Sequence, residues 1–253
     1  MNDAIVIRYA NVTKAFGRHV VLDDVSCAIR RNKITVIVGP SGVGKSVFIK
    51  HVVGLLKPDE GSVTVDGVEV TTLDGRGLYS LRKRFGMMFQ DGALFDSMSV
   101  GENVAFPLVQ HTRKPRAEID RIVAEKLAAV GLPGIEYLFP SELSGGMRKR
   151  VGFARAIVLE PEIVLFDEPN SGLDPVMADA IDSLILRMQR ELGITFLVIS
   201  HDIASTRRIA DDVGMLYNGR LVAFGPREKV MESGDPILRQ FFSRTAEGPI
   251  RLV

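Results

Sequence analysis

The stretch from Gly39 to Ser46 constrains this chain more than any other feature of its sequence. It reads Gly-Pro-Ser-Gly-Val-Gly-Lys-Ser, follows the apolar run Ile34 to Val38, and precedes apolar residues at helical spacing. This pattern predicts a strand, a phosphate-binding loop and a helix, because closely spaced glycines let backbone N–H groups point inward at a helix N-terminus. Lys45 would reach the terminal phosphates, and the Ser46 hydroxyl suits Mg²⁺. A flexible turn is the alternative, and the flanking strand and helix patterns disfavour it.

The bulk composition narrows the class of protein. The net charge of +1, with acids and bases interspersed, gives no global field for nucleic acid or anionic lipid, so partners must be recognised locally. Cys27 is the single cysteine, which excludes an internal disulfide and fits a reducing compartment. No window approaches about 18 uninterrupted apolar residues, and the N-terminus lacks the pattern of a signal peptide. We expect a soluble, cytosolic chain whose membrane contacts go through a partner.

Apolar runs and turn residues divide most of the chain into alternating strands and helices. Strands are expected at Ile5 to Val12, Val25 to Ile29, Ile34 to Val38, Ser62 to Val70 with a turn at Asp66-Gly67, Arg84 to Phe89, Ile163 to Phe166, Thr195 to Ser200, and in a closing hairpin about Asn218-Gly219. The first strands form an antiparallel edge. A long helix at Pro175 to Leu192 lies between two later strands, and this alternation indicates a parallel sheet covered by helices.

One stretch, from Asp91 to about Val158, reads as helices without strands. Ser99 to Glu102 forms a capping box, and Arg116 to Val130 carries apolar residues on one face. We therefore predict an α/β fold with a helical subdomain inserted into it. The core spans about 1–90 and 159–230, the helical subdomain about 91–158, and a C-terminal tail about 231–253.

Several polar residues occur where strands end. Asp167 and Glu168 follow an apolar strand, at the edge of a parallel sheet where ligands bind, although many buried strands end in solvated acids. With a phosphate loop present, Asp167 would hold Mg²⁺ and Glu168 would polarise the attacking water. Gln90 could contact both metal and water. His201 could hydrogen-bond the γ-phosphate or be a structural residue, and Phe16 could pack in the core or stack on a purine ring.

The segment Leu143 to Met147, Leu-Ser-Gly-Gly-Met, precedes an apolar helix face and implies a second anion-binding helix start, unless it is an ordinary glycine-rich one. The ordered set of motifs resembles the ATPase subunit of the ATP-binding cassette (ABC) family. The Walker A motif corresponds to Gly39–Ser46, the Q-loop to Gln90, the signature to Leu143–Met147, Walker B to Ile163–Glu168, the D-loop to Ser171–Asp174, and the switch histidine to His201. The resemblance implies a P-loop fold with a RecA-like parallel-sheet core.

In that family two cassettes meet head to tail, so the resemblance implies a homodimer in which each ATP contacts both copies. Residues expected to contact ATP are Phe16, Gly39, Pro40, Ser41, Gly42, Val43, Gly44, Lys45, Ser46, Asp174 and, from the other copy, Ser144, Gly145 and Gly146. Residues expected to hold Mg²⁺ are Ser46, Gln90 and Asp167. Those expected to act in hydrolysis are Glu168, Gln90 and His201.

Three further segments resemble the ATPases that serve MCE-protein lipid transporters, including the Mla system: Gln90 to Phe95, Ala105 to Leu108 and Ser144 to Arg150. Met147 stands where solute importers more often have Gln, and Asn170 departs from the common Thr or Phe. Arg148, Lys149 and Arg150 could bind nucleic acid or lipid, but we expect them to form a solvated helix face with some phosphate or interface contacts. The resemblance implies an ATP-hydrolysing subunit on the cytoplasmic face of the cell's inner membrane, serving a separate permease that moves lipid.

The partners expected on this basis are permease subunits, an MCE-domain lipid-binding protein and a small accessory protein, with no nucleic acid. The apolar segment Gly92 to Leu108 would dock the permease. The tail from Ser243 to Val253 could be a frayed, solvated terminus, but its apolar end leads us to expect that it packs on the other ATPase copy or on the accessory protein. Alternatives are a solute-importer ATPase and a soluble ABC protein of DNA repair or translation; the latter typically carry a second cassette, a coiled coil or a zinc insertion.

Overall fold

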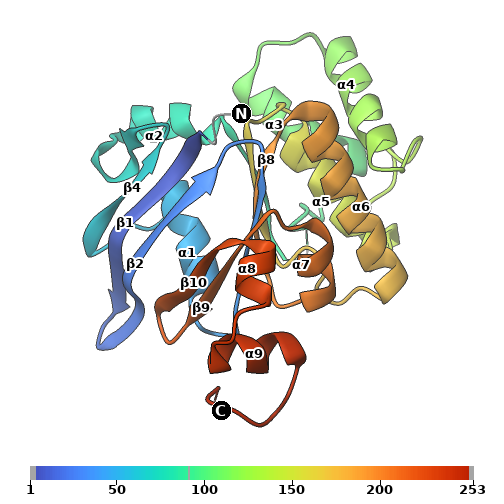
Figure 1. Cartoon of the computed structure of the whole chain (residues 1–253). Coiled ribbons are helices and arrows are strands. Elements are labelled where there is room, and N and C mark those ends of the chain that lie inside the picture. The colour runs from blue at the N-terminus through green and yellow to red at the C-terminus, as the bar shows by residue number, and fades with distance from the viewer. Residues whose placement is uncertain (1–3, 91, 251–253) are drawn as a thin grey trace. The chain divides into compact units, whose positions relative to one another are not determined.

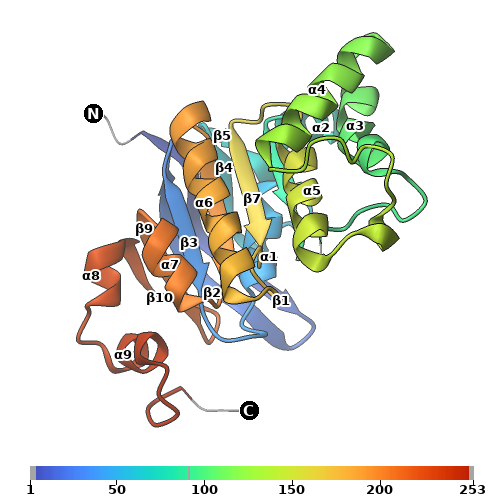
Figure 2. The same cartoon turned by 90° about the vertical axis from the view of Figure 1, so that its right-hand side faces the viewer.

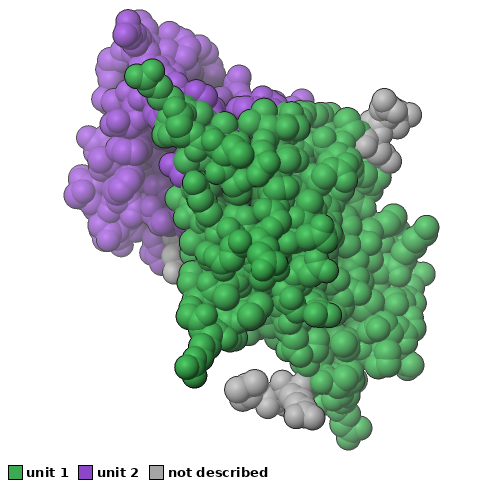
Figure 3. Space-filling model, turned by 90° about the vertical axis from the view of Figure 1, so that its left-hand side faces the viewer, with its two compact units in different colours: residues 1–78, 197–253 green, residues 79–196 purple. Residues whose placement is uncertain are grey.

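A computed structural model describes residues 4–90 and 92–250 of the chain. They form two compact units, one of residues 4–78 and 197–250 and the other of residues 79–90 and 92–196 (Figure 3). The boundary falls within helix α2, Gly75–Arg82, and within strand β8, Thr195–Ser200. The boundaries that we predict for the core and the helical subdomain divide the chain elsewhere and remain a prediction.

The first unit contains an antiparallel sheet of four strands (Figure 1). Its order is β2-β1-β4-β5, with bounds Ile5–Phe16 for β1, His19–Arg30 for β2, Glu60–Val65 for β4 and Val68–Glu69 for β5. The β4–β5 turn has positive φ at both Asp66 (48°) and Gly67 (75°), as two-residue hairpin turns require. Strands β1 and β2 are longer than predicted, because they continue as a hairpin whose residues are mostly exposed and carry no apolar alternation.

The other strands of the first unit include β3, Ile34–Val38, which leads directly into the phosphate loop. Strand β3 is wholly buried and pairs in parallel with β9, Asp212–Tyr217, which pairs in turn with β10, Arg220–Pro226. Helix α1, Lys45–Val52, contacts β2 and β4. The Tyr9 ring stacks on Phe48 of α1 with centroids 4.1 Å apart, and its hydroxyl donates to the Phe48 carbonyl at 2.9 Å. This contact fixes the helix that follows the loop against the antiparallel sheet.

The remaining elements of this unit are short helices. They are η1 (Val70–Thr72), α7 (Ile203–Ile209), α8 (Arg227–Met231) and α9 (Pro236–Ser243). Asp235 caps α9 by accepting from Ile237 N at 2.8 Å. The tail then folds back on its own chain, because Gln240 Oε1 accepts from Ile250 N at 2.6 Å and Tyr217 Oη donates to the Pro249 carbonyl at 3.2 Å. Residues 251–253 of the predicted contact segment lie outside the described residues.

The second unit joins a parallel strand pair to a group of helices. Strand β6, Phe85–Met88, pairs with β7, Ile163–Asp167, and α6 spans Pro175–Leu192. Helices α3 (Val100–His111), α4 (Arg116–Ala129) and α5 (Gly145–Ile157) pack on one another (Figure 2), and the short η2 (Pro140–Glu142) precedes α5. The predicted capping box is confirmed, with Ser99 and Glu102 each accepting from the other's backbone N–H. The predicted α/β class, with an antiparallel edge and an inserted helical segment, is confirmed.

Candidate functional site

The phosphate loop connects β3 to α1 in the first unit. Gly39 has φ +153°, and a Cβ there would lie 2.2 Å from the Leu216 carbonyl oxygen of β9. Gly44 has φ +98° and immediately precedes α1, and a Cβ there would lie 2.6 Å from a Val21 methyl group. Glycine is therefore required at both positions by the neighbouring strands as well as by backbone conformation. The strand, loop and helix of this prediction are confirmed.

Lys45 points back into the loop that precedes it. Its ammonium donates to the carbonyls of Gly39 and Pro40, both at 2.9 Å, and the residue is only 6% exposed. Ser46 follows at the first turn of α1 and is half-buried. This places a cation, a hydroxyl and the N-terminus of α1 around one loop, which is the arrangement that binds a polyphosphate.

Two more predicted residues lie in the first unit. Phe16, at the end of β1, is 48% exposed, and the Lys14 ammonium lies 5.6 Å from the centre of its ring. The structure thus places this ring on the surface and not in the core; its stacking on a purine remains a prediction. His201 is exposed after β8, where Asp202 caps α7 by accepting from Ala204 N at 2.8 Å.

The carboxylates lie in the second unit at the end of β7. Asp167 ends the strand and is half-buried, and Glu168 follows with φ +55°, a left-handed conformation that is uncommon for a residue with a side chain. A turn follows, closed by Ser171 N donating to the Glu168 carbonyl at 3.2 Å. Gln90, two residues beyond β6, donates through Nε2 to Ser171 Oγ at 3.2 Å. The structure therefore brings Gln90 next to the turn that carries Glu168.

Asn170, which stands where Thr or Phe is common, forms a hydrogen bond with a residue of α6. Asn170 is 8% exposed, and its Nδ2 donates to Oδ1 of the buried Asp182 at 2.8 Å. Among the described residues, no hydrogen-bond partner is found for the buried Oδ1 of Asn170. A polar pair with Asp182 thus occupies the position within the Glu168–Ser171 turn where the resemblance predicts Thr or Phe.

The signature segment begins α5. Ser144 caps the helix by accepting from Met147 N at 3.2 Å, and both Ser144 and Gly145 are exposed. Gly146 is buried, since a Cβ there would lie 2.3 Å from the Met177 methyl group of α6. Asp174 caps α6 by accepting from Val176 N and Met177 N, at 2.9 and 3.0 Å. The exposed start of α5 leaves its first N–H groups able to face an anion.

The prediction that Arg148, Lys149 and Arg150 are solvated is wrong for Lys149. Arg148 is exposed and Arg150 is half-buried, but Lys149 is 4% exposed and lies within α5 between the buried Gly146 and Phe153. Helical spacing places Gly146, Lys149 and Phe153 on one face, and that signal could have identified Lys149 as buried. Its ammonium donates to the carbonyl of Ser171.

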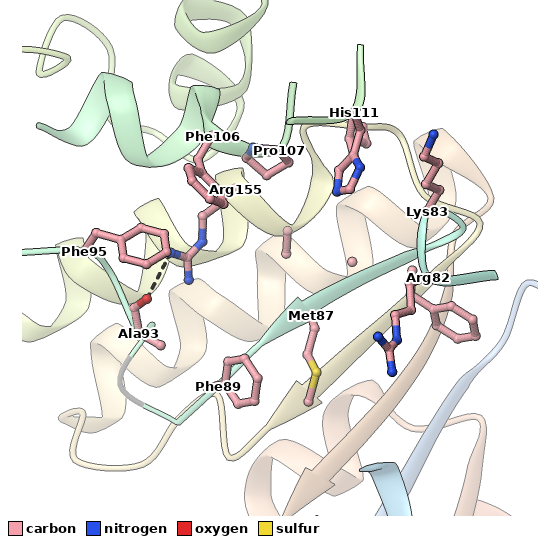
Figure 4. A pocket seen from close by; sticks show the side chains of 14 residues that line it. Arg82, Lys83, Met87, Phe89, Ala93, Phe95, Phe106, Pro107, His111 and Arg155 are labelled. Atoms are coloured by element: carbon pink, nitrogen blue, oxygen red, sulfur yellow. Dashed lines mark hydrogen bonds between the residues drawn. The ribbon is translucent and has the colours of Figure 1, made fainter. Parts of the chain in front are cut away.

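A groove of about 330 Å³ lies in the second unit (Figure 4). The Phe95 and Phe106 rings form one wall, with centroids 5.0 Å apart, and His111 and Lys83 lie at the other end. Arg155 of α5 donates to the carbonyls of Gly92 and Ala93 at 2.6 and 2.9 Å. The predicted docking segment thus contributes to a real groove.

Val100 does not belong to that surface, contrary to expectation. It is 0% exposed and begins α3, where its N–H donates to the Leu138 carbonyl at 2.7 Å. Its apolar side chain packs in the core of the helical segment. The sequence alone could not separate it from Phe95, because both are apolar residues next to the same loop.

The residues predicted to hold Mg²⁺ have suitable chemistry. Ser46, Gln90 and Asp167 offer a hydroxyl, an amide and a carboxylate oxygen, and Mg²⁺ prefers few protein oxygens together with substrate phosphates. Ser46 and Asp167 are half-buried, so each presents part of its side chain at the surface of its own unit. That these residues meet on one metal ion remains a prediction.

Comparison with known proteins agrees with these motifs. Residues 22–171 match the ABC transporter family, which is more than half of the chain. This chain belongs to the ABC transporter family. It is 47% identical over 97% of its length to the "Probable ribonucleotide transport ATP-binding protein mkl" of Mycobacterium tuberculosis, covering 68% of that protein. It is 40% identical over 98% of its length to the "Intermembrane phospholipid transport system ATP-binding protein MlaF" of Escherichia coli, covering 92% of that protein.

Solved ABC cassettes share this fold. The dimeric structure of the cassette MJ0796 bound to ADP and Pi matches with a TM-score of 0.79 and 30% identity, covering 87% of this chain and 98% of that one. As a member of this family, the present chain binds ATP and is an ATP hydrolase of the ABC transport class. Within residues 4–90 and 92–250, no helix is both long and apolar enough to cross a membrane.

Proposed function

We propose that this ABC ATPase acts as a head-to-tail homodimer whose two ATP molecules are each held between the phosphate loop of one copy and the signature of the other. Lys45, Ser46 and the loop from Gly39 bind the phosphates of one copy's own ATP, with Phe16 stacked on the purine. Ser144, Gly145 and Gly146 of the other copy complete the site, with Asp174 at its border. The observation that carries this proposal is that the chain presents two anion-binding helix starts, at α1 and at α5.

The residues expected to act in hydrolysis at each site lie at or near the ends of strands. Ser46, Asp167 and Gln90 would hold Mg²⁺ together with the phosphates, and the ion would supply positive charge against the charge that develops on the transferred phosphoryl group. Glu168 accepts the proton of the attacking water, and His201 donates a hydrogen bond to the γ-phosphate. Gln90 also contacts Ser171 of the catalytic turn, which links the metal ligand to the position of Glu168.

Mixing two inactive variants tests the composite sites. Ser144→Arg blocks the ATP of the partner, and Lys45→Ala removes the phosphate contact within its own copy. Each variant alone should lack hydrolysis, while a mixed dimer keeps one site with both halves intact. Recovery of ATPase activity on mixing supports the proposal. A mixture no more active than either variant alone contradicts it.

The groove supports docking of a membrane permease. Its apolar wall at Phe95 and Phe106, and the cations Arg82, Lys83 and Arg155 along its rim, suit a short amphipathic segment that carries a carboxylate. Phe95→Asp should therefore abolish co-purification of permease subunits from membranes, because it removes an apolar ring from the wall and places a carboxylate near Arg155, where it competes with the carboxylate of the docking segment.

Val109→Asp is the matched control for the groove. Val109 is an exposed apolar residue, 54% accessible, on the same helix α3 but outside the groove. It should leave co-purification unchanged. Equal loss of the permease with both variants would show that general surface charge, and not the groove, governs binding.

The cargo that we propose is phospholipid, moved through the permease with an MCE-domain partner while the ATPase lies on the cytoplasmic face of the cell's inner membrane. The named MlaF relatives and the MCE-type segments at Gln90, Ala105 and Ser144 support this cargo. A second candidate is ribonucleotide, since the mycobacterial relative, 47% identical, carries that name. Mass spectrometry of the complex purified from native membranes distinguishes them, because bound phospholipid with an MCE subunit supports the first and bound nucleotide other than ATP and ADP supports the second.

A further inference from the structure

Lys149 is the buried cation that the mechanism above does not use. It is 4% exposed on α5, and its ammonium donates to the Ser171 carbonyl and lies 3.5 Å from the Glu168 carbonyl. These two carbonyls belong to the first and last residues of the turn that carries Glu168. One side chain from the signature helix therefore spans both ends of the catalytic turn.

The type of residue matters at this position. A buried ammonium is costly unless its donors find acceptors, and the carbonyls of Ser171 and Glu168 accept from this one. Glu168 adopts a left-handed conformation with φ +55°, which a residue with a side chain keeps only when its surroundings hold it. An apolar side chain at position 149 would fill the same space, but it would leave the Ser171 carbonyl without this donor.

The contact also joins two functional elements of one chain. Gly145, the first residue of α5, precedes Lys149 by four residues, about 6 Å along a helix, so a shift of the helix start moves the ammonium with it. In the proposed dimer, the start of α5 faces the partner's ATP, whereas Glu168 acts on its own chain's ATP. Lys149 thus connects the two ATP sites through a single rigid helix.

We propose that Lys149 is a positioning residue that holds the Glu168–Ser171 turn in its own chain and so makes hydrolysis at one site depend on the signature helix that closes the other. This inference rests on the proposed composite sites. Lys149→Met should keep ATP binding and lower kcat roughly 10- to 100-fold, since a misplacement of about 1 Å in a catalytic group can have that effect. Lys149→Arg, which keeps the cation, should recover most of the rate.

Two mixtures decide on which ATP Lys149 acts. When Lys149→Met is mixed with Ser144→Arg, one site combines the normal Glu168 and Lys149 of the second chain with the intact Ser144 of the first, so activity should return. When Lys149→Met is mixed with Glu168→Gln, neither site has a correctly held glutamate, so the rate should not rise above the low rate of Lys149→Met alone. A rise in the second mixture, or none in the first, overturns the proposal.

Two control experiments test whether the loss of hydrolysis is specific to Lys149. A mixture of Ser144→Arg with Glu168→Gln leaves Lys149 unchanged and should recover activity; if it does not, the composite sites fail and not the role of Lys149. Lys126→Met removes a lysine of the same unit whose side chain is 13% exposed and pairs with the exposed Glu160, and it should hydrolyse ATP at the rate of the unaltered chain. Equal loss of activity in Lys149→Met and Lys126→Met would show an effect of charge alone and overturn the proposal.

Discussion

Asn103 holds the segment that presents Phe95 to the groove, and replacing it by alanine should release that segment. The side chain is 0% exposed, its Oδ1 accepts from Phe95 N at 2.8 Å, and its Nδ2 lies 3.0, 3.1 and 3.0 Å from the carbonyls of Phe95, Met98 and Ser99. One amide therefore holds both ends of the segment from Phe95 to Ser99 against α3. We expect Asn103→Ala to reduce both stability and permease binding.

The magnitude follows from which groups lose their partners. The carbonyls of Phe95 and Ser99 keep a second donor, Met98 N and Asn103 N, but the Phe95 N–H loses the Asn103 oxygen. One unsatisfied donor costs about 1–3 kcal/mol, and the weakened carbonyl bonds bring the loss in free energy of unfolding to about 2–4 kcal/mol. At about 2–4 °C per kcal/mol for a chain of this size, Tm should fall by roughly 4–16 °C.

Thermal unfolding followed by circular dichroism measures this change, and co-purification with membrane permease subunits measures the functional part. Gln110→Ala is the control, because Gln110 is an exposed amide on the same helix. ATP binding by the isolated chain should survive Asn103→Ala, since the phosphate loop belongs to the other unit. A Tm within about 1 °C of the unaltered chain, with permease binding intact, would refute the reasoning.

Three other predictions concern the active site, pH and the tail. Glu168→Gln should lower hydrolysis about 10²- to 10⁴-fold with ATP affinity unchanged; turnover within a few-fold of the unaltered chain, measured by phosphate release, would reject Glu168 as the base. Burial lowers the pKa of His51 below its usual value near 6.5, so the unfolded chain takes up this proton first and stability falls as pH drops through about 6.5 towards the lower folded pKa. His51→Leu should therefore show a smaller fall in Tm between pH 7.5 and 5.5, and an unchanged fall would exclude this histidine. Deleting residues 243–253 should weaken assembly without nucleotide while leaving monomer ATP affinity unchanged; equal masses by light scattering with and without the tail would confine its role to the contacts that Gln240 and Tyr217 make within the chain.

Much of the fold could be predicted because its signals are local. The bounds of β3, α6 and β8 agree with the structure residue by residue, since apolar runs, a capping Asp174 and a terminal Gly193 mark them. The hairpin of β1 and β2 was predicted too short, and α7 was not predicted. In both cases the element depends on neighbours that are distant in sequence, and its own pattern is weak.

The candidate site divides in the same way. The order and spacing of the glycine loop, the paired carboxylates and the Ser144 helix start were sufficient to predict their elements and the family, because each motif carries its chemistry in adjacent residues. For Phe16, by contrast, the sequence did not distinguish a core position from a surface position, and the structure shows its ring exposed. Val100 and Phe95 both lie in the segment predicted to dock the permease, but Val100 is buried in the core and Phe95 is exposed.

By itself, the sequence of this chain determined the phosphate loop, the strand that ends at Asp167 and the helix that starts after Ser144, because backbone conformation and capping depend on neighbouring residues. Only the tertiary structure decided that the Lys149 ammonium reaches the Ser171 carbonyl, and that the Asn103 amide holds the segment carrying Phe95. The physical reason is that burial of a polar side chain depends on which backbone groups the fold brings within hydrogen-bond range, and periodicity along one helix does not specify those partners.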